Sequence, residues 1–226
     1  MIRLLMLVEG QSEEIFVKKT LTPHLASHGV VVESPILLWT KRIPSGGGFR
    51  GGVSNWNQIR ANLKHLFKDT DAWVSTLFDF YGLPKDFPGY DEAHGAGDSR
   101  KKVTTLQIRF KTEMNHPRFI PFFALHEFEA WLFCSPDIVS EHFGNIWLAT
   151  KMQEVVKQVG EPELINHGEK THPKAQLQKF DMGYKETSDG PTLIDKIGIP
   201  VIRGCCPHFS GWLQQLEALG KTTDCH

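Results

Sequence analysis

The chain has 226 residues, enough for one domain with a complete core. Apolar residues make up 40% of it and charged residues 23%, as in ordinary soluble globular proteins. Lysine and arginine number 25 against 26 acids, a net charge of −1, which excludes binding of nucleic acid by bulk positive charge alone but leaves room for a local basic groove.

The four cysteines (Cys134, Cys205, Cys206 and Cys225) are too few and too irregularly spaced for the disulfide framework of a secreted protein. The N-terminus has no signal-peptide pattern, and no apolar stretch approaches the roughly 20 residues that a transmembrane helix needs. We therefore expect a cytoplasmic protein that does not associate with membranes.

The N-terminal segment predicts a strand, a helix and a second strand. Residues 2–8 form an apolar run, interrupted by Arg3 alone, as in a strand covered on both faces. We expect a helix to begin with Ser12 as its cap and to end near Gly29, and a β-rich run to follow over 30–38. This order of elements is typical of an α/β fold.

The middle of the chain continues the alternation of strands and helices. In chain order it predicts a glycine-rich loop over 43–54, a helix over 56–67 capped by Asn55, a strand over 73–78 that runs into Asp79, an excursion rich in Gly, Pro and Asp over 81–97, a helix over 99–115, and a strand over 119–125. Beyond residue 135 the patterns are mostly helical. We therefore expect a mostly parallel sheet of four or five strands with helices on both faces, in which residues 1–135 form the α/β core and residues 136–226 a helical extension packed on it, within one structural domain.

Three acids follow predicted strands. Glu9, Asp79 and Glu127 each follow an apolar run of about six or seven residues, with His126 before Glu127. Because ligands bind outside the carboxyl ends of parallel strands, these carboxylates should meet at one edge and repel one another unless a cation intervenes. Oxygen ligands favour Mg²⁺ or Mn²⁺, which suit phosphodiester chemistry. The alternative for each acid is a helix cap or a solvated turn.

Several segments resemble a known family. They are Val8-Glu9-Gly10-Gln11-Ser12-Glu13, Thr76 to Pro84 (TLFDFYGLP), His126-Glu127-Phe128-Glu129-Ala130, Gly190-Pro191 and Cys206-Pro207-His208-Phe209. Together they resemble the bacterial Toprim-like family known as domain of unknown function 4276. Toprim relatives include topoisomerases, primases, a ribosomal RNA maturase and the nucleases of overcoming-lysogenization-defect type.

The resemblance implies a Toprim-like three-layer fold and roles for the acids. Glu9 would be the general acid/base or a metal ligand, Asp79 a metal ligand, and Glu127 or Glu129 a further ligand. Glu13 stands where the related nucleases use a second acid, although acids at a helix start are also favoured by the helix dipole. The chain departs from the Asp-x-Asp pattern, because Tyr81 occupies the position of the second aspartate.

Basic and histidine residues add candidates to the site. His126 could orient a carboxylate or a water, or instead complete a hydrogen-bond network in the core. Lys174 and Lys185 lie in loops beside predicted helices and could offset charge that builds on a phosphate, whereas most surface lysines have no such role.

The glycine-rich segment and the C-terminal cysteines give weaker indications of a functional site than the acids do. The segment lacks the Gly-Lys-Ser/Thr ending of a P-loop, so we interpret it as a mobile loop from which Lys41, Arg42 and Arg50 could contact a nucleic-acid backbone. Cys205, Cys206 and His208 have no second ligand pair at zinc spacing, which favours core and turn roles.

The sequence thus predicts a Mg²⁺- or Mn²⁺-dependent nuclease or related phosphotransfer enzyme that acts on DNA or RNA. By resemblance, we expect an effector in bacterial or phage defence, a neighbouring ATPase or sensor protein as a partner, and a chain that could oligomerise. One alternative is a Toprim-shaped subunit that binds nucleic acid or a partner without catalysis, which Tyr81 favours. Another is a small-molecule phosphatase or nucleotide hydrolase that uses the same acids.

Overall fold

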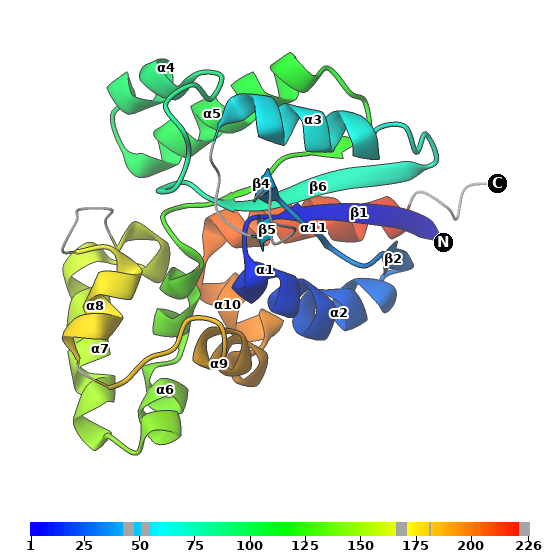
Figure 1. The fold of residues 1–226 in the computed structure, drawn as a ribbon. Helices are drawn as coiled ribbons and strands as arrows, with labels where there is room; N and C mark the ends of the chain where they lie inside the picture. The colour runs from blue at the N-terminus through cyan, green and yellow to red at the C-terminus, as the bar shows by residue number, and fades with distance from the viewer. Residues whose placement is uncertain (43–47, 51–54, 166–170, 181, 222–226) are drawn as a thin grey trace.

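The computed structural model describes residues 1–42, 48–50, 55–165, 171–180 and 182–221. This part of the chain has a β-sheet between two layers of helices, with a further group of helices at one end (Figure 1). The predicted α/β class with a mostly parallel sheet is confirmed. None of the described helices is long and apolar enough to cross a membrane.

The central sheet has six strands in four parallel tracks. Its order is β2–β1–β6–β7, with β3 also pairing with β1 and β8 also pairing with β6. The strands are β1 (Ile2–Val8), β2 (Val30–Val32), β3 (Ile36–Leu37), β6 (Ala72–Asp79), β7 (Phe119–Ile120) and β8 (Phe123–Ala124). The strands β1 and β6 are central and pair in parallel from Arg3–Ala72 to Val8–Leu77. Their carboxyl ends therefore lie side by side, as the acids after them require.

Two predicted strands are each divided by a proline. Pro35 separates β2 from β3, and Pro121 separates β7 from β8. Because proline has no N–H to donate to the ladder, regular pairing stops at these positions. Beside Pro121, the hydroxyl of Thr76 accepts from Phe122 N at 2.9 Å and lies 3.1 Å from Phe122 O, so a side chain of β6 bridges the gap.

One face of the sheet is covered by α3 (Trp56–Leu66), α4 (Tyr90–Gly95) and α5 (Ser99–Met114) (Figure 1). The predicted cap of α3 is confirmed, because the Asn55 side chain accepts from Gln58 N at 3.0 Å. Phe110 of α5 packs edge-on against Phe87, with ring centroids 5.0 Å apart, at the centre of this apolar layer.

The opposite face is covered by both ends of the chain. A continuous helical run comprises α1 (Gln11–Phe16), the π-helical segment η1 (Val17–Leu21) and α2 (Thr22–Ala26), and beside it lie α9 (Asp189–Ile197), α10 (Ile199–Cys205) and α11 (Pro207–Lys221) (Figure 1). Trp212 of α11 stacks on Phe122 at 4.3 Å between centroids, and its indole N–H donates to Ser75 Oγ at 3.0 Å. The C-terminal helix is therefore part of the core beneath the sheet.

The cap that we predicted for the first helix is wrong. Gly10 is the N-cap residue, so Ser12 lies inside the first turn of α1. Its hydroxyl donates instead to the carbonyl oxygen of Glu186 at 3.1 Å. A distant loop thus takes the hydrogen bond that local spacing assigned to the helix backbone.

A further group of helices lies beyond the carboxyl end of the sheet (Figure 1). The helical group comprises η2 (Phe128–Cys134), α6 (Pro136–Phe143), α7 (Ile146–Val159), η3 (Pro162–Leu164) and α8 (Pro173–Lys179). A separate antiparallel pair is formed by β4 (Trp39–Arg42) and β5 (Gly48–Arg50). The predicted loop over 43–54 therefore contains a short strand, and its residues 43–47 and 51–54 lie outside the described part.

Candidate metal centre at the carboxyl edge of the sheet

Glu9 and Asp79 meet at the ends of the two central strands. Glu9 is the residue after β1, and Asp79 is the last residue of β6. The backbone N–H of Asp79 donates to Glu9 Oε2 at 3.0 Å. Asp79 Oδ1 in turn accepts from the backbone N–H of Phe128 at 3.1 Å, which joins the end of β6 to the segment after β8. The strand ends are thus connected through the two carboxylates.

Two glycines make room for this arrangement. A Cβ atom on Gly82 would lie 3.0 Å from Glu9 Oε1, and one on Gly10 would lie 2.9 Å from Glu13 Oε2. A side chain at either position would therefore push a carboxylate away from the edge. Both glycines lie in the segments that carry the family resemblance.

Glu127 is held from the side by α8. Its Oε2 lies 2.9 Å from His172 Nδ1 and accepts from the backbone N–H of Lys174 at 3.0 Å. The backbone N–H of Ala175 also lies 3.4 Å from His172 Nδ1, but the shorter contact with a carboxylate makes this nitrogen the donor. The start of α8 therefore depends on a carboxylate from the strand edge.

Glu13 and Glu129 are buried beside these acids. Their exposed fractions are 6% and 3%. The phenol of Tyr184 donates to Glu129 Oε1 at 3.2 Å. Burial, followed by the charge of Glu129, raises the pKa of Tyr184, so the phenol stays a donor. The structure thus brings together five predicted acids: Glu9, Glu13, Asp79, Glu127 and Glu129.

Burial and mutual repulsion raise the pKa values of three of these acids. Burial and then the charge of Glu9 raise the pKa of Glu13 to about 8. Burial and then Glu13 raise the pKa of Asp79 well above its ordinary value. Burial and then Glu127 raise the pKa of Glu129 to about 7. Such a group of carboxylates takes up protons unless a cation neutralises it, and its all-oxygen donor set fits Mg²⁺ or Mn²⁺.

The predicted basic residues are placed unequally around the acids. The Lys174 ammonium pairs with the carboxylate of Glu186. Burial lowers the pKa of Lys174, but the bond to Glu186 and the neighbouring acids outweigh it and raise the pKa. Lys185 is exposed, and its backbone N–H donates to Asp189 Oδ2 at 2.7 Å. Lys41 and Arg42 lie on β4 and Arg50 lies on β5.

His126 lies inside the protein. Its side chain has no exposed surface, and its ring centroid is 6.4 Å from that of Phe80. Its carbonyl oxygen accepts from Tyr81 N at 3.2 Å. The structure therefore places His126 within the packed core next to the edge rather than on the solvent side of the acids.

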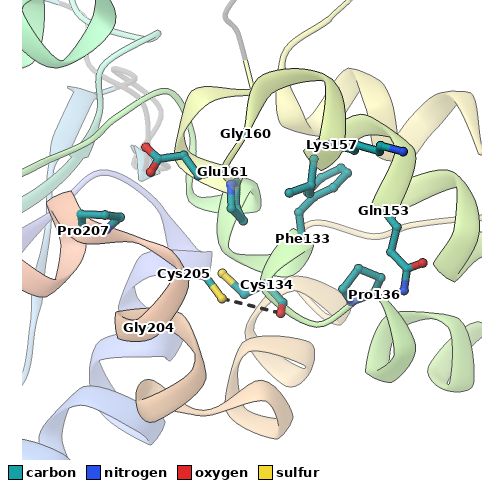
Figure 2. Close-up of a pocket in the computed structure, with 12 residues that line it drawn as sticks. Phe133, Cys134, Pro136, Gln153, Lys157, Gly160, Glu161, Gly204, Cys205 and Pro207 are labelled. Carbon is teal, nitrogen blue, oxygen red and sulfur yellow. Dashed lines mark hydrogen bonds between the residues drawn. The ribbon is translucent and has the colours of Figure 1, made fainter.

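Cys134, Cys205 and Cys206 lie in the helical part of the chain, and Cys225 lies outside the described residues. Cys134 Sγ and Cys206 Sγ are 3.3 Å apart, and His208 Nε2 lies 3.0 Å from the carbonyl oxygen of Phe123. Cys134 and Cys205 line a cavity of about 540 Å³ between η2, α7 and α10, as Figure 2 shows. Cys206 is fully buried and His208 stacks on Phe122, so the expected core and turn roles of these residues agree with the structure.

Sequence reasoning missed three residues at the site: His172 and Tyr184, which contact the acids, and Glu186, which pairs with Lys174. All come from the segment between 171 and 186, which reaches the edge only in the folded chain. Tyr184 lies against Gly190 of the Gly190-Pro191 segment, where a Cβ would be 2.7 Å from its hydroxyl, but this contact is visible only in the folded chain. His172 precedes a proline at the start of a helix, a common pattern that does not distinguish a site.

The chain was compared with known protein structures, curated proteins and protein families. The chain is similar over 97% of its length to the C-terminal region of the Burkholderia pseudomallei OLD protein, with 99% of that chain covered, 13% identity and a TM-score of 0.48. It is similar over 95% of its length to the C-terminal region of the Xanthomonas campestris pv. campestris OLD protein, with 95% of that chain covered, 14% identity and a TM-score of 0.37. No curated protein matches. A family model, Domain of unknown function (DUF4276), matches residues 8–217, so the chain belongs to this family, as its motifs indicated.

Proposed function

We propose that the protein is a divalent-metal-dependent phosphodiesterase that cleaves DNA or RNA. The observation that carries this proposal is the meeting of five carboxylates, from β1, α1, β6 and the segment after β8, at one edge of the sheet. Three of them have raised pKa values, which is the mark of a site that accepts positive charge. The Toprim-like motifs of the sequence support the same chemistry.

The five acids would have different roles in metal binding. Glu9, Asp79 and Glu127 would hold Mg²⁺ or Mn²⁺, with Glu13 and Glu129 adding negative charge behind them. The bound cation would polarise a phosphoryl oxygen and lower the pKa of an attacking water. Phe128 N–H orients Asp79, while His172 and Lys174 N–H orient Glu127. These bonds reduce the freedom of the ligands before substrate arrives.

Two residues of the chain are suited to proton transfer and charge neutralisation. Glu9 lies at the carboxyl end of the central strand β1 and is partly exposed, so it would take or return a proton at the scissile oxygen. Lys174 would exchange Glu186 for a phosphate oxygen as negative charge develops there. His126 would act through the packing of the edge, because its side chain is buried.

Nucleic acid would reach this edge through a local basic surface. Lys41 and Arg42 on β4, Arg50 on β5 and Lys185 after α8 are the proposed contacts with the phosphate backbone. Since the net charge is −1, affinity would depend on these few contacts and fall with salt. The resemblance to overcoming-lysogenization-defect nucleases extends the proposal to a cytoplasmic effector in bacterial or phage defence that works beside an ATPase or sensor protein.

The test is cleavage of mixed DNA and RNA substrates with Mg²⁺ or Mn²⁺. Glu9→Gln and Asp79→Asn should each abolish metal-dependent cutting, because each removes one charge and keeps the side-chain volume. Glu154→Gln, an equal change on the exposed face of α7, is the matched control and should cut as the wild type does. Cutting that persists in both site variants would contradict the proposal, and nucleotides or phosphomonoesters in the same assay test the small-molecule alternative.

A second candidate is a non-catalytic subunit that binds nucleic acid or a partner protein. Two observations favour it: Tyr81 stands in place of the second aspartate, and Lys174 is already paired with Glu186. Calorimetry distinguishes the two candidates. Binding of Mn²⁺ that Asp79→Asn abolishes favours the enzyme, whereas no binding of Mg²⁺ or Mn²⁺ together with no cutting favours the subunit.

A further inference from the structure

A second group of ligand atoms lies on the face of the molecule formed by both ends of the chain. His24 lies in α2, His28 in the turn after it, and Glu217 in α11. His24 Nε2 is 2.7 Å and His28 Nε2 is 3.9 Å from Glu217 Oε1. The three ligand atoms all lie within 4.8 Å of one another, close enough to share one ion. None of these residues belongs to the carboxylate edge.

A close backbone contact between α11 and the turn after α2 holds this group together. Gly29 has φ of +77°, and a Cβ on Gly220 would lie only 1.7 Å from the carbonyl oxygen of His28. Only glycine at 220 permits this approach, so the turn at His28 and Gly29 packs directly on the backbone of α11. Glu217 lies three residues before Gly220, almost one helical turn away, and therefore faces the two histidines.

The contacts of His28 leave a ring nitrogen available to a metal. Its Nδ1 lies 3.0 Å from the carbonyl oxygen of His24, which can only accept, so Nδ1 carries a proton. The hydroxyl of Ser27, 3.1 Å from the same nitrogen, can take either role. Nε2 lies 3.9 Å from Glu217 Oε1, and in the neutral ring this nitrogen has the lone pair that a metal ion needs. A histidine whose Nδ1–H is held by a backbone carbonyl is the arrangement found at metal-bound imidazoles.

Arg203 also binds Glu217. Its guanidinium donates to Glu217 Oε1 at 2.9 Å and to Oε2 at 3.3 Å. A carboxylate has two oxygens with about four acceptor positions, so Arg203 and a cation can share it. The guanidinium is nevertheless a positive charge next to the site and lowers its affinity for any metal ion.

We propose that His24, His28 and Glu217 form a zinc-binding site, with water as the fourth ligand, that fastens the turn after α2 to α11. Two imidazole nitrogens and one carboxylate oxygen are a ligand set of Zn²⁺, whereas the all-oxygen edge suits Mg²⁺ or Mn²⁺. The site is separate from the proposed nuclease chemistry. A bound ion would stabilise the face on which the first and last helices of the chain meet.

The test is zinc binding by metal-stripped protein without an affinity tag, in excess Mg²⁺. Calorimetry should find one Zn²⁺ per chain, and Co²⁺ as a probe should give the visible absorption of a tetrahedral site. Loss of groups that only orient a ligand weakens metal binding about 10–100-fold, so His28→Gln and Glu217→Gln should weaken it at least as much. Circular dichroism checks that each variant folds.

Three controls make the outcome decisive. His65→Gln removes an exposed histidine on α3 and should bind Zn²⁺ as the wild type does. Asp79→Asn should also leave zinc binding unchanged, which separates this site from the carboxylate edge. Arg203→Gln should tighten zinc binding, because it removes the neighbouring positive charge. No zinc binding by the wild type, or equal binding by His28→Gln, would overturn the proposal and leave these residues as an ion-pair network.

Discussion

The phenol ring of Tyr81 stacks on the imidazole of His172, with ring centroids 5.3 Å apart and 16° between the ring planes. His172 in turn lies 2.9 Å from a carboxylate oxygen of Glu127. Tyr81 therefore supports a histidine that holds an acid of the site, at the position where Toprim motifs have a second aspartate. Where the motif has an aspartate that could bind metal, this chain has a tyrosine whose ring stacks on His172, the residue that contacts Glu127.

Replacement of Tyr81 should separate the role of its ring from that of its hydroxyl. Tyr81→Ala removes the stacking partner of His172 and should weaken Mn²⁺ binding several-fold, because Glu127 becomes less well oriented. Tyr81→Phe keeps the ring and should bind as the wild type does. Calorimetry with both variants measures the difference. An equal loss in Tyr81→Phe would show that the hydroxyl matters instead.

Glu127 should hold the start of α8 in place. Glu127→Ala leaves the backbone N–H of Lys174 without its acceptor, which should cost about 1–3 kcal/mol locally. Hydrogen exchange over 173–179 should therefore accelerate in Glu127→Ala, and less so in Glu127→Gln, which keeps an acceptor oxygen. Glu154→Ala on α7 serves as the control. Unchanged exchange in Glu127→Ala would mean that α8 is held by its apolar contacts alone.

The buried acids should make the metal-free protein less stable as pH rises. The ordinary pKa of Glu13 is 4.5, and in the folded chain it is about 8. Between these values the folded chain keeps a proton that the unfolded chain loses, so the free energy of unfolding falls as pH increases from 4.5 to 8. Glu129, with a pKa raised to about 7, acts in the same direction.

Glu13→Gln should remove part of this pH dependence. In EDTA at pH 8, we expect the variant to be more stable than the wild type by more than about 1 kcal/mol, since one pKa unit corresponds to about 1.4 kcal/mol. Urea denaturation at several pH values measures the effect. The same variant should gain less stability from Mn²⁺ than the wild type does. Parallel curves for the two proteins would contradict this electrostatic account.

Ser75 should be important for stability rather than for chemistry. It has no exposed surface, accepts from Trp212 Nε1 at 3.0 Å and donates to Ile120 O at 2.6 Å. Ser75→Ala leaves the buried indole N–H unpaired, which should lower the free energy of unfolding by about 1–3 kcal/mol. Urea denaturation measures this loss against Ser188→Ala, an exposed serine that should change little.

The layers of the fold and the main acids could be predicted from local patterns. Residues 4–8 are continuously apolar and residues 72–78 are mostly so, because both faces of a central parallel strand are covered, and that pattern is visible without any partner. Glu9, Asp79 and Glu127 follow such strands, so the topology of a parallel sheet places them at one edge. The cap at Asn55 was predictable for the same local reason.

Other features depended on contacts between distant segments. Ser12 has the spacing of a helix cap, but Glu186, 174 residues later, supplies the acceptor that it uses. His172 and Tyr184 carry no distinguishing pattern, and the fold of the C-terminal half brings them to Glu127 and Glu129. Likewise, His24, His28 and Glu217 meet only because Gly220 lets two backbones touch. The sequence by itself determined the central strands, the helices beside them and the acids at the strand ends, because these follow from periodicity within a few residues. Only the tertiary structure decided the partners of those acids and the grouping of His24, His28 and Glu217, because hydrogen bonds and steric fit between remote segments leave no local period in the chain.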